Sequence, residues 1–236
     1  MPPIDDQLSL GSCSADAIVA AMEFKYSGFI GSRLFLYYNE RLLTHTVNSD
    51  SGSSVENGIH AATTYGVCEE SFYPYHVNLF TVEPSKEAYE NGLLYRIQGT
   101  KKLDRDMNAF KNCLVDGLPF VASIIIYSSF EAHKLPVSGI LTLPRGTEDN
   151  LGGHAVLICG YDDTLQCWIL RNSWGPKWCK KGYCYLPYVY LMDSTLATEF
   201  WAVTEVGPGP MPGSGPATKH VFITYPSSDA NERWVL

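Results

Sequence analysis

Four residues whose side chains support nucleophilic acyl transfer follow one another along the chain: Gln7, Cys13, His154 and Asn172. Cys13 stands at the start of an apolar helical run. There, unpaired backbone N–H groups and the helix dipole favour a thiolate over a thiol. A cysteine at a helix start is, by itself, more often an ordinary small residue than a nucleophile. The interpretation therefore depends on its companions.

His154 lies in the segment Gly-Gly-His-Ala-Val, residues 152–156. The two glycines allow a tight approach just before a strand, which predicts that His154 stands at the start of the strand rather than within it. A histidine in that place is poised at a surface or a cleft, where it can serve as a base. Without Cys13, a structural histidine with satisfied hydrogen bonds would explain it equally well.

Three further side chains complete the chemistry. Asn172 ends the strand that pairs with the His154 strand in the predicted hairpin, so its side chain can hold the imidazole in the productive tautomer. Trp174 can shield that hydrogen bond from water. Gln7 can donate its amide to a developing oxyanion together with the backbone N–H of Cys13. Singly, the Asn-Ser-Trp-Gly segment indicates only a turn and Gln7 only a loop.

In combination, the segments at residues 7–13, 152–156 and 171–175 resemble the papain-like cysteine peptidases over about residues 2–206. The resemblance implies peptide hydrolysis through a thioester on Cys13, with His154 as general base and then general acid. It also implies Gln7 in the oxyanion hole and no need for a metal or organic cofactor. The implied partners are peptide or protein substrates.

The resemblance further implies which residues bind substrate. The backbone of the segment Gly52, Ser53 and Ser54 would hydrogen-bond an extended peptide, and the other expected contacts are Ile124, Gly153, Ala155, Trp174 and Thr198. This small and apolar lining predicts an apolar side chain two residues before the scissile bond. If Glu199 points inward, a basic side chain is accepted instead, although an outward, solvated glutamate is commoner.

Three positions depart from the family pattern. Leu10 replaces the usual cysteine that is disulfide-bonded to the non-catalytic lobe, Ser14 replaces the usual aromatic residue, and Ser53 replaces a frequent glycine. These departures resemble the shorter bacterial and viral branch of the family rather than the lysosomal enzymes.

The remaining pattern predicts an α+β fold in two lobes, one helical and one an antiparallel, barrel-like sheet, with the cleft between them. Helices are predicted at residues 15–25, 33–43, 55–65 and 104–116, and strands at residues 120–127, 155–161, 166–171, 182–186 and 200–205. Ser12 or Ser14 is the expected N-cap of the first helix. We predict one peptidase domain over residues 1–206, with the lobe boundary near residues 100–120.

Residues 207–236 are predicted to form a linker and a C-terminal tail. Residues 207–215 are rich in Gly and Pro, and residues 220–225 form the strand-like run HVFITY. The simpler interpretation is a loosely attached tail. The alternative is that HVFITY docks as an extra strand or crosses the binding surface, which would allow autoinhibition.

Composition excludes several classes of partner. The formal charge is −8 without a basic tract, which argues against nucleic acid or an anionic membrane, and no apolar run approaches the length of a membrane span. The first ten residues show neither a secretory signal nor an inhibitory pro-segment. Whether such a segment has been removed or never existed is left open. We expect an intracellular or virion-associated protein.

The chain has seven cysteines, and six remain once Cys13 is set aside. Because a reducing compartment is expected, we favour free thiols for all six. Cys159 and Cys167 lie in apolar strand-like runs and are predicted to be buried small hydrophobes. Cys179 and Cys184 leave open a local disulfide or weak metal ligation.

Two other functions share this set of residues. A ligase or transpeptidase would use the same acyl-enzyme but favour an amine over water, and a product assay separates the two. A non-catalytic binding module of this fold would normally have lost the Cys, the His or the Asn, and all three are present here.

Overall fold

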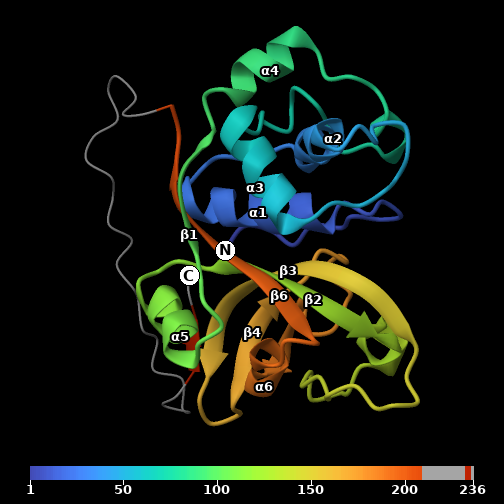
Figure 1. The fold of residues 1–236 in the computed structure, drawn as a ribbon, viewed down its shortest axis with the longest axis vertical. Helices are drawn as coiled ribbons and strands as arrows, with labels where there is room; N and C mark the ends of the chain where they lie inside the picture. The colour runs from blue at the N-terminus through green and yellow to red at the C-terminus, as the bar shows by residue number, and fades with distance from the viewer. Residues whose placement is uncertain (209–231, 235–236) are drawn as a thin grey trace.

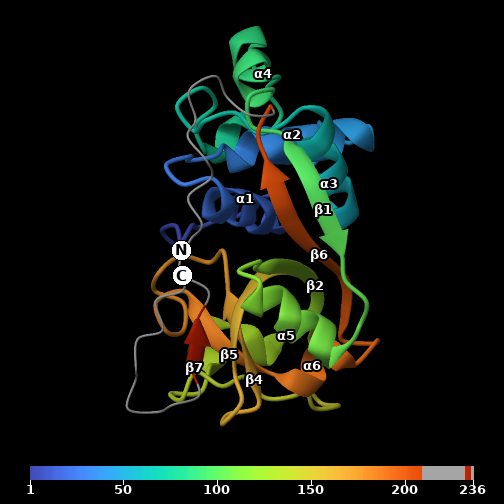
Figure 2. The same cartoon turned by 90° about the vertical axis from the view of Figure 1, so that its left-hand side faces the viewer.

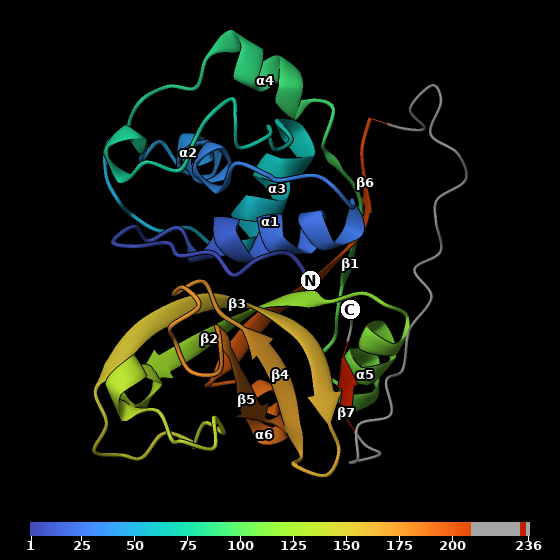
Figure 3. The same ribbon diagram turned by 180° about the vertical axis from the view of Figure 1, so that it is seen from behind.

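The computed structural model describes residues 1–208 and 232–234. Its helices and strands separate into two halves (Figure 1). We call the half built from α1, α2, α3 and α4 the helical lobe, and the half built on the sheet, with α5 and α6, the β lobe. The two lobes meet where α1 lies against β3 (Figure 3).

The helices are short except for the first three. Their bounds are α1 Cys13–Lys25, α2 Arg33–Leu43, α3 Val55–Thr64, α4 Lys86–Gly92, α5 Met107–Val115 and α6 Tyr188–Met192, with short 3-10 helices at Val77–Leu79, Ser128–Phe130 and Ala132–Lys134.

The strands form one antiparallel sheet with the order β1-β6-β2-β3-β4-β5. Because β1 and β5 stand at its two ends, the sheet of the described residues does not close into a barrel. β1 and β6 run side by side from the β lobe up along the helical lobe (Figure 2). The strand bounds are β1 Ile97–Lys102, β2 Phe120–Tyr127, β3 Asn150–Asp162, β4 Cys167–Arg171, β5 Tyr183–Pro187, β6 Ala197–Val206 and β7 Glu232–Trp234.

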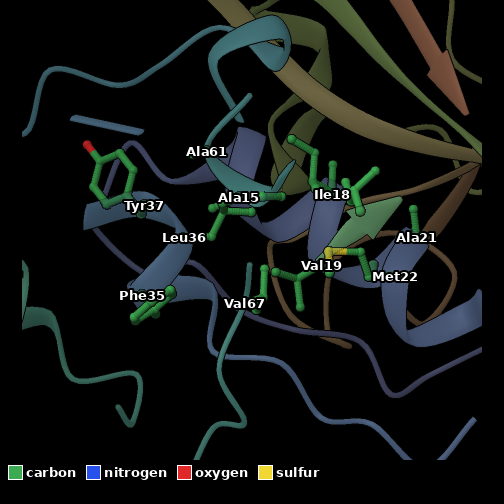
Figure 4. Close-up of a cluster of buried hydrophobic side chains, with 14 of the residues drawn as sticks. Ala15, Ile18, Val19, Ala21, Met22, Phe35, Leu36, Tyr37, Ala61 and Val67 are labelled. Atoms are coloured by element: carbon green, nitrogen blue, oxygen red, sulfur yellow. The ribbon is translucent and has the colours of Figure 1, made fainter. Parts of the chain in front are cut away.

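The first helix is buried because apolar residues occupy nearly all of its sides. Ile18, Val19 and Met22 of α1 are fully buried, and they pack against residues of α2 and α3 in the core of the helical lobe (Figure 4). Ala155 and Leu157 of β3 belong to the same apolar cluster. The helix that carries Cys13 is therefore held by both lobes, and burial of such side chains is worth about 1.5–3 kcal/mol each.

The β lobe has its own core of stacked and edge-on aromatic rings. Phe110 of α5 stacks on Phe120 of β2 at a centroid distance of 5.0 Å and contacts Trp168 of β4 edge-on at 5.7 Å. Aromatic rings bury large apolar areas and fix orientation through such contacts. This core gives the strands that carry the functional residues a rigid support.

The predicted α+β architecture in two lobes is confirmed, and so are the three long helices and all five predicted strands to within a few residues. The strand expected at residues 155–161 is longer than predicted, because β3 begins at Asn150. His154 therefore lies inside a strand, and the prediction that it stands at the start of the strand was wrong. Strand β1 and helices α4 and α6 were not predicted.

The structure bears on the predicted N-cap of the first helix and on part of the C-terminal tail. Ser12 occupies the N-cap position of α1, but its side chain makes no capping hydrogen bond. Residues 220–225, the HVFITY run, lie outside the described residues, whereas β7, nearer the C-terminus, pairs antiparallel with β3 at Gly160–Asp162. Among the residues that the structure describes, no helix has the length and apolar character needed to cross a bilayer.

Candidate active site

Cys13 is the first residue of α1, at the end of the helix where backbone N–H groups are unpaired. Its neighbour Ser12 is fully buried and donates its hydroxyl to Asp16 Oδ2 at 2.8 Å instead of capping the helix. Backbone hydrogen bonds from Ala155 and Ser14 act to lower the pKa of the Cys13 thiol. Because Ala155 follows His154 in β3, the thiol lies beside the strand that carries the histidine.

The histidine is fixed by a short hydrogen bond. His154 Nε2 lies 2.7 Å from Asn172 Oδ1, and the backbone N–H of Ser173 donates to the same oxygen at 2.8 Å. Since an amide oxygen only accepts, Nε2 carries the proton in this pair. Nδ1 of the neutral ring is then left free to accept a proton from a thiol, which is the tautomer that a base for Cys13 requires.

An aromatic enclosure surrounds this hydrogen bond. Trp174 lies 5.0 Å from His154 between ring centroids, and Phe130 contacts His154 edge-on at 5.9 Å. Trp178 packs on Phe130 and donates its indole N–H to the Phe130 carbonyl at 3.1 Å. Trp174 therefore shields the imidazole as expected from the sequence. Phe130 and Trp178 were not predicted, although Trp178 follows Trp174 closely enough to have suggested a shared cluster.

Burial favours the neutral form of both reacting groups taken singly. It raises the pKa of Cys13 to about 11, against a lowering by the N–H groups of Ala155 and Ser14, and it lowers the pKa of His154 to about 4, against a raising by Asn172. The lowered thiol pKa expected from the helix N-terminus is thus outweighed by burial. Transfer of the proton from sulfur to imidazole creates two opposite charges that stabilise each other, so the pair ionises as a unit.

Gln7 is buried and held on three sides. Its Nε2 donates to the Leu10 carbonyl at 2.8 Å, its Oε1 accepts from Ser173 Oγ at 2.7 Å, and its backbone N–H donates to the Ser173 carbonyl at 2.8 Å. One amide N–H remains for a further acceptor, because the group has two. The segment before Cys13 is therefore anchored to the turn after Asn172.

The predicted substrate-binding residues come from both lobes: residues 52–54 precede α3 of the helical lobe, and Gly153 lies in β3 of the β lobe. Gly52 has a φ of +68°, donates its N–H to Tyr37 Oη at 3.1 Å, and leads through the half-buried Ser53 to Ser54, the N-cap of α3. A Cβ at Gly153 would meet nothing within 4 Å, so open space lies beside His154. Open backbone at this place is what an approaching peptide needs.

Ile124 and Thr198 were both predicted to border the substrate pocket, and the structure places them differently. Ile124 is 1% exposed and packs in the core of the β lobe, so the prediction that it borders the pocket was wrong. Ser123, the preceding residue, faces the other side of β2 and contacts Glu199. Thr198 is exposed, as a residue at a binding surface must be, whereas Glu199 is half-buried and hydrogen-bonded rather than solvated.

The departures from the family pattern change local packing. Leu10 is 4% exposed and belongs to the apolar core of the helical lobe, which replaces a covalent link by hydrophobic contact. Ser14 donates its hydroxyl to Glu40 Oε2 at 2.7 Å, so a buried polar pair stands where an aromatic ring is usual. Burial raises the pKa of Glu40 to about 8.

The cysteines are unpaired in the structure, as we favoured from the sequence. All seven are free, and Cys159 and Cys167 are buried in strands. Within residues 1–208 and 232–234, no cluster of His, Cys, Asp or Glu has the composition of a metal site. Cys179 and Cys184 form no disulfide.

Comparisons with known proteins agree with this geometry. The model of the papain family cysteine proteases matches residues 1–198. An uncharacterized peptidase C1-like protein of Acanthamoeba polyphaga mimivirus is 38% identical over 215 residues, which are 85% of this chain and 69% of that protein. The crystal structure of xylellain, a cysteine protease from Xylella fastidiosa, has a TM-score of 0.82 at 36% identity, covering 86% of this chain and 83% of that one.

More distant matches extend the likeness. Digestive procathepsin L 3 of Tenebrio molitor has a TM-score of 0.66 at 19% identity, with 86% of this chain and 67% of that chain covered, which shows the fold alone. This chain spans 49% of the length of cysteine proteinase EP-B 1 of Hordeum vulgare, to which it is 26% identical. The chain belongs to the papain family of cysteine proteases, and its relatives include viral and bacterial members, as the departures at Leu10 and Ser14 suggested.

Proposed function

We propose that this papain-family thiol protease is an endopeptidase in which Cys13 is the nucleophile, His154 the general base and acid, Asn172 the orienting residue and Gln7 an oxyanion donor. The observation that carries the proposal is the 2.7 Å hydrogen bond from His154 Nε2 to Asn172, which leaves Nδ1 free to act as a base. Ala155, the next residue of β3, contacts Cys13 through its backbone. A buried structural histidine would not need an unpaired thiol next to it at a helix start.

The reaction would proceed in two halves. The Cys13 sulfur transfers its proton to His154 Nδ1 and bonds to the peptide carbonyl carbon, whose oxygen becomes an oxyanion held by the Gln7 amide and the Cys13 N–H. The C–N bond then breaks as the imidazolium protonates the leaving amine. Water, deprotonated by His154, attacks the thioester, and the C–S bond breaks to release the acid and restore the thiol.

The test compares two half-buried thiols of the chain. Cys13→Ala is expected to abolish peptide hydrolysis while the circular dichroism spectrum and the melting temperature stay close to those of the parent. Cys179→Ala, the matched control at the other half-buried cysteine, is expected to retain full activity. Full activity in Cys13→Ala would overturn the assignment, and analysis of products with and without an added amine distinguishes hydrolysis from transpeptidation.

We further propose that the enzyme prefers an apolar side chain two residues before the scissile bond. Support comes from the small side chains of Ser54 and Ala155 among the predicted pocket residues, and from Glu199, whose carboxylate is already engaged by protein donors. A peptide library varied at that position checks the preference. Faster cleavage of peptides that carry a basic side chain two residues before the scissile bond would contradict it.

A second proposal concerns the C-terminal tail. We propose that the tail beyond Gly215 restricts access to the site, because the Gly- and Pro-rich residues 207–215 before it give reach and because β7, which belongs to the tail, is paired with β3 in the β lobe. β7 pairs with β3 from Gly160 onward, six residues or roughly 20 Å along the strand from His154, so β7 itself does not cover the site.

Truncation tests the tail. A chain ending at Gly207 is expected to show a higher kcat/KM than the full chain. Arg233→Pro, which removes a backbone donor from β7, is expected to give a smaller rise in the same direction. Unchanged kinetics after truncation would refute inhibition by the tail.

We also propose an intracellular or virion-associated location, supported by seven unpaired cysteines, which suit a reducing compartment. Thiol titration of the denatured protein, isolated from its native source without reductant, is expected to find seven reactive groups. Fewer than seven would point to disulfides and an oxidising compartment.

A further inference from the structure

Glu199 has an unusual backbone and an unusual set of partners. It lies in β6 with a φ of +50°, a left-handed conformation that residues other than Gly rarely adopt. The register between β2 and β6 shifts at the same point, because Ala122 pairs with Phe200 while Ser123 pairs with Thr198. Glu199 is therefore the extra residue of a β-bulge, a feature that redirects a side chain out of the regular alternation.

The bulge directs the Glu199 carboxylate at the other lobe. Its Oε1 accepts a hydrogen bond from the backbone N–H of Glu56 at 3.2 Å, and its Oε2 accepts one from Ser123 Oγ at 3.0 Å. Glu56 lies in the first turn of α3, where Ser54 Oγ accepts from the N–H of Asn57 at 3.1 Å. Two N–H groups of this turn are thus satisfied, one by its own N-cap and one by a residue 143 positions away.

This contact joins the two structural walls between which the substrate is expected to lie. On one side, Gly52 to Ser54 lead directly into α3. On the other, Glu199 follows the exposed Thr198 in β6. The positive end of the helix dipole favours a carboxylate at this place, so the attraction is electrostatic as well as directional. The Glu56 side chain turns elsewhere, 3.9 Å from Lys102, in a pair exposed to solvent.

We propose that Glu199 is a positioning residue that clasps the start of α3 to β2 and β6 and so fixes the spacing of the two walls of the substrate-binding site. This inference rests on the proposed function, since it assumes that peptide lies along residues 52–54. A carboxylate that holds the α3 N-terminus is not presented to a basic substrate side chain. Glu199 then acts on substrates of every charge alike.

The first experiment measures the clasp without any substrate. Hydrogen exchange at the Glu56 amide is expected to be about 3- to 10-fold faster in Glu199→Ala, because a net hydrogen-bond contribution is lost. Glu199→Gln keeps one carbonyl acceptor and is expected to restore most of the protection. Glu205→Gln, which removes a charge from an exposed position of the same strand, is the matched control and leaves exchange unchanged. Equal exchange in all four proteins would overturn the clasp.

The second experiment measures its consequence for peptide. Glu199→Ala is expected to raise KM about 3- to 10-fold for peptides with apolar and with basic side chains alike, while alkylation of Cys13 by iodoacetamide keeps its rate. A loss confined to basic peptides would overturn the proposal and make Glu199 a specificity acid. If the parent protein cleaves no peptide, the proposed function fails, while the exchange experiment still decides whether the clasp exists.

Discussion

The two sides of the active site differ in the kinds of side chain that surround the reacting group. On the nucleophile side, buried polar groups stand behind Cys13: Ser14 donates to Glu40 at 2.7 Å, and Arg33 pairs with Asp16 at 2.6 Å. On the base side, His154 has a single strong hydrogen bond, to Asn172, inside an aromatic enclosure. The helical lobe thus places buried titratable groups behind its reacting group, and the β lobe places aromatic rings around its own.

This difference indicates a division of labour. Aromatic rings exclude water and hold an imidazole plane, but they respond little to pH. Buried carboxyl groups change charge within the working range, since burial raises the pKa of Asp16 to about 6 and that of Glu40 to about 8. The base side therefore sets geometry, and the nucleophile side sets the electrostatic environment of sulfur. Substitutions at four positions test this comparison, from the largest expected effect to the smallest.

Removal of the base has the largest expected effect. His154→Ala is expected to lower kcat by about 10⁴-fold or more, since nucleophile and base act as a unit. The Cys13 thiol would keep the pKa of about 11 that burial gives it, without a partner to take its proton. Alkylation by iodoacetamide at pH 7 should therefore slow as well. An unchanged alkylation rate would show that sulfur is activated by its helix alone.

Loss of the orienting residue comes next. Asn172→Ala is expected to lower kcat by about 10²-fold with little change in KM, because the imidazole loses its fixed tautomer but remains a base. Steady-state kinetics on one peptide measure the two constants. A rise in KM without a fall in kcat would assign Asn172 to substrate binding instead.

The aromatic shield has a smaller expected effect. Trp174→Ala is expected to lower kcat/KM by about 10-fold, because water then competes for the hydrogen bond between His154 and Asn172. Trp174→Phe keeps an apolar ring over His154 and is expected to stay within about 3-fold of the parent. If the two variants lose activity equally, the indole rather than its shielding matters.

The smallest effect on turnover is expected on the nucleophile side, for substitution of Glu40. There the informative measurement is the change of the melting temperature with pH. The raised pKa of Glu40 means that the folded state binds more protons than the unfolded chain between its ordinary value of 4.5 and about 8. Its contribution to stability is thus complete at low pH and lost as pH rises to about 8. The melting temperature of Glu40→Gln is expected to fall less from pH 5 to pH 8 than that of the parent.

The melting temperature of Glu40→Gln is still expected to fall somewhat from pH 5 to pH 8, because burial also raises the pKa values of Asp16 and Glu23, to about 6 and about 7. Two parallel curves for parent and Glu40→Gln would contradict a buried, protonated Glu40. Turnover at pH 7 should change by no more than about 3-fold, because an amide replaces a neutral acid.

The parts predictable from the sequence are those that local patterns determine. Cys13 heads a run of helix formers, and Asn172 directly follows a β-rich segment, so their placement follows from short-range rules. His154 was placed at a strand start because Gly152 and Gly153 precede it. Pairing with the full length of β2 extends β3 back to Asn150 and overrides that local signal.

Several of the missed features depend on partners that are distant in the sequence. Ile124 and Ser123 differ by one position on β2, and a one-residue error in alignment turns every side chain to the opposite face. Strand β1 is polar and becomes a strand only by pairing with β6, about a hundred residues later. Phe130 joins the active site through tertiary packing, and nothing in its neighbours along the chain indicates that role.

The contacts of Gln7 bear on the order of events during synthesis. Its N–H and side chain are both held by Ser173, 166 residues later in the chain, and Arg171 also binds the carbonyls of Pro2 and Pro3. During synthesis residues 171–173 emerge well after the segment that carries Cys13. That segment therefore reaches its final, anchored position only once the β lobe has been made as far as Ser173.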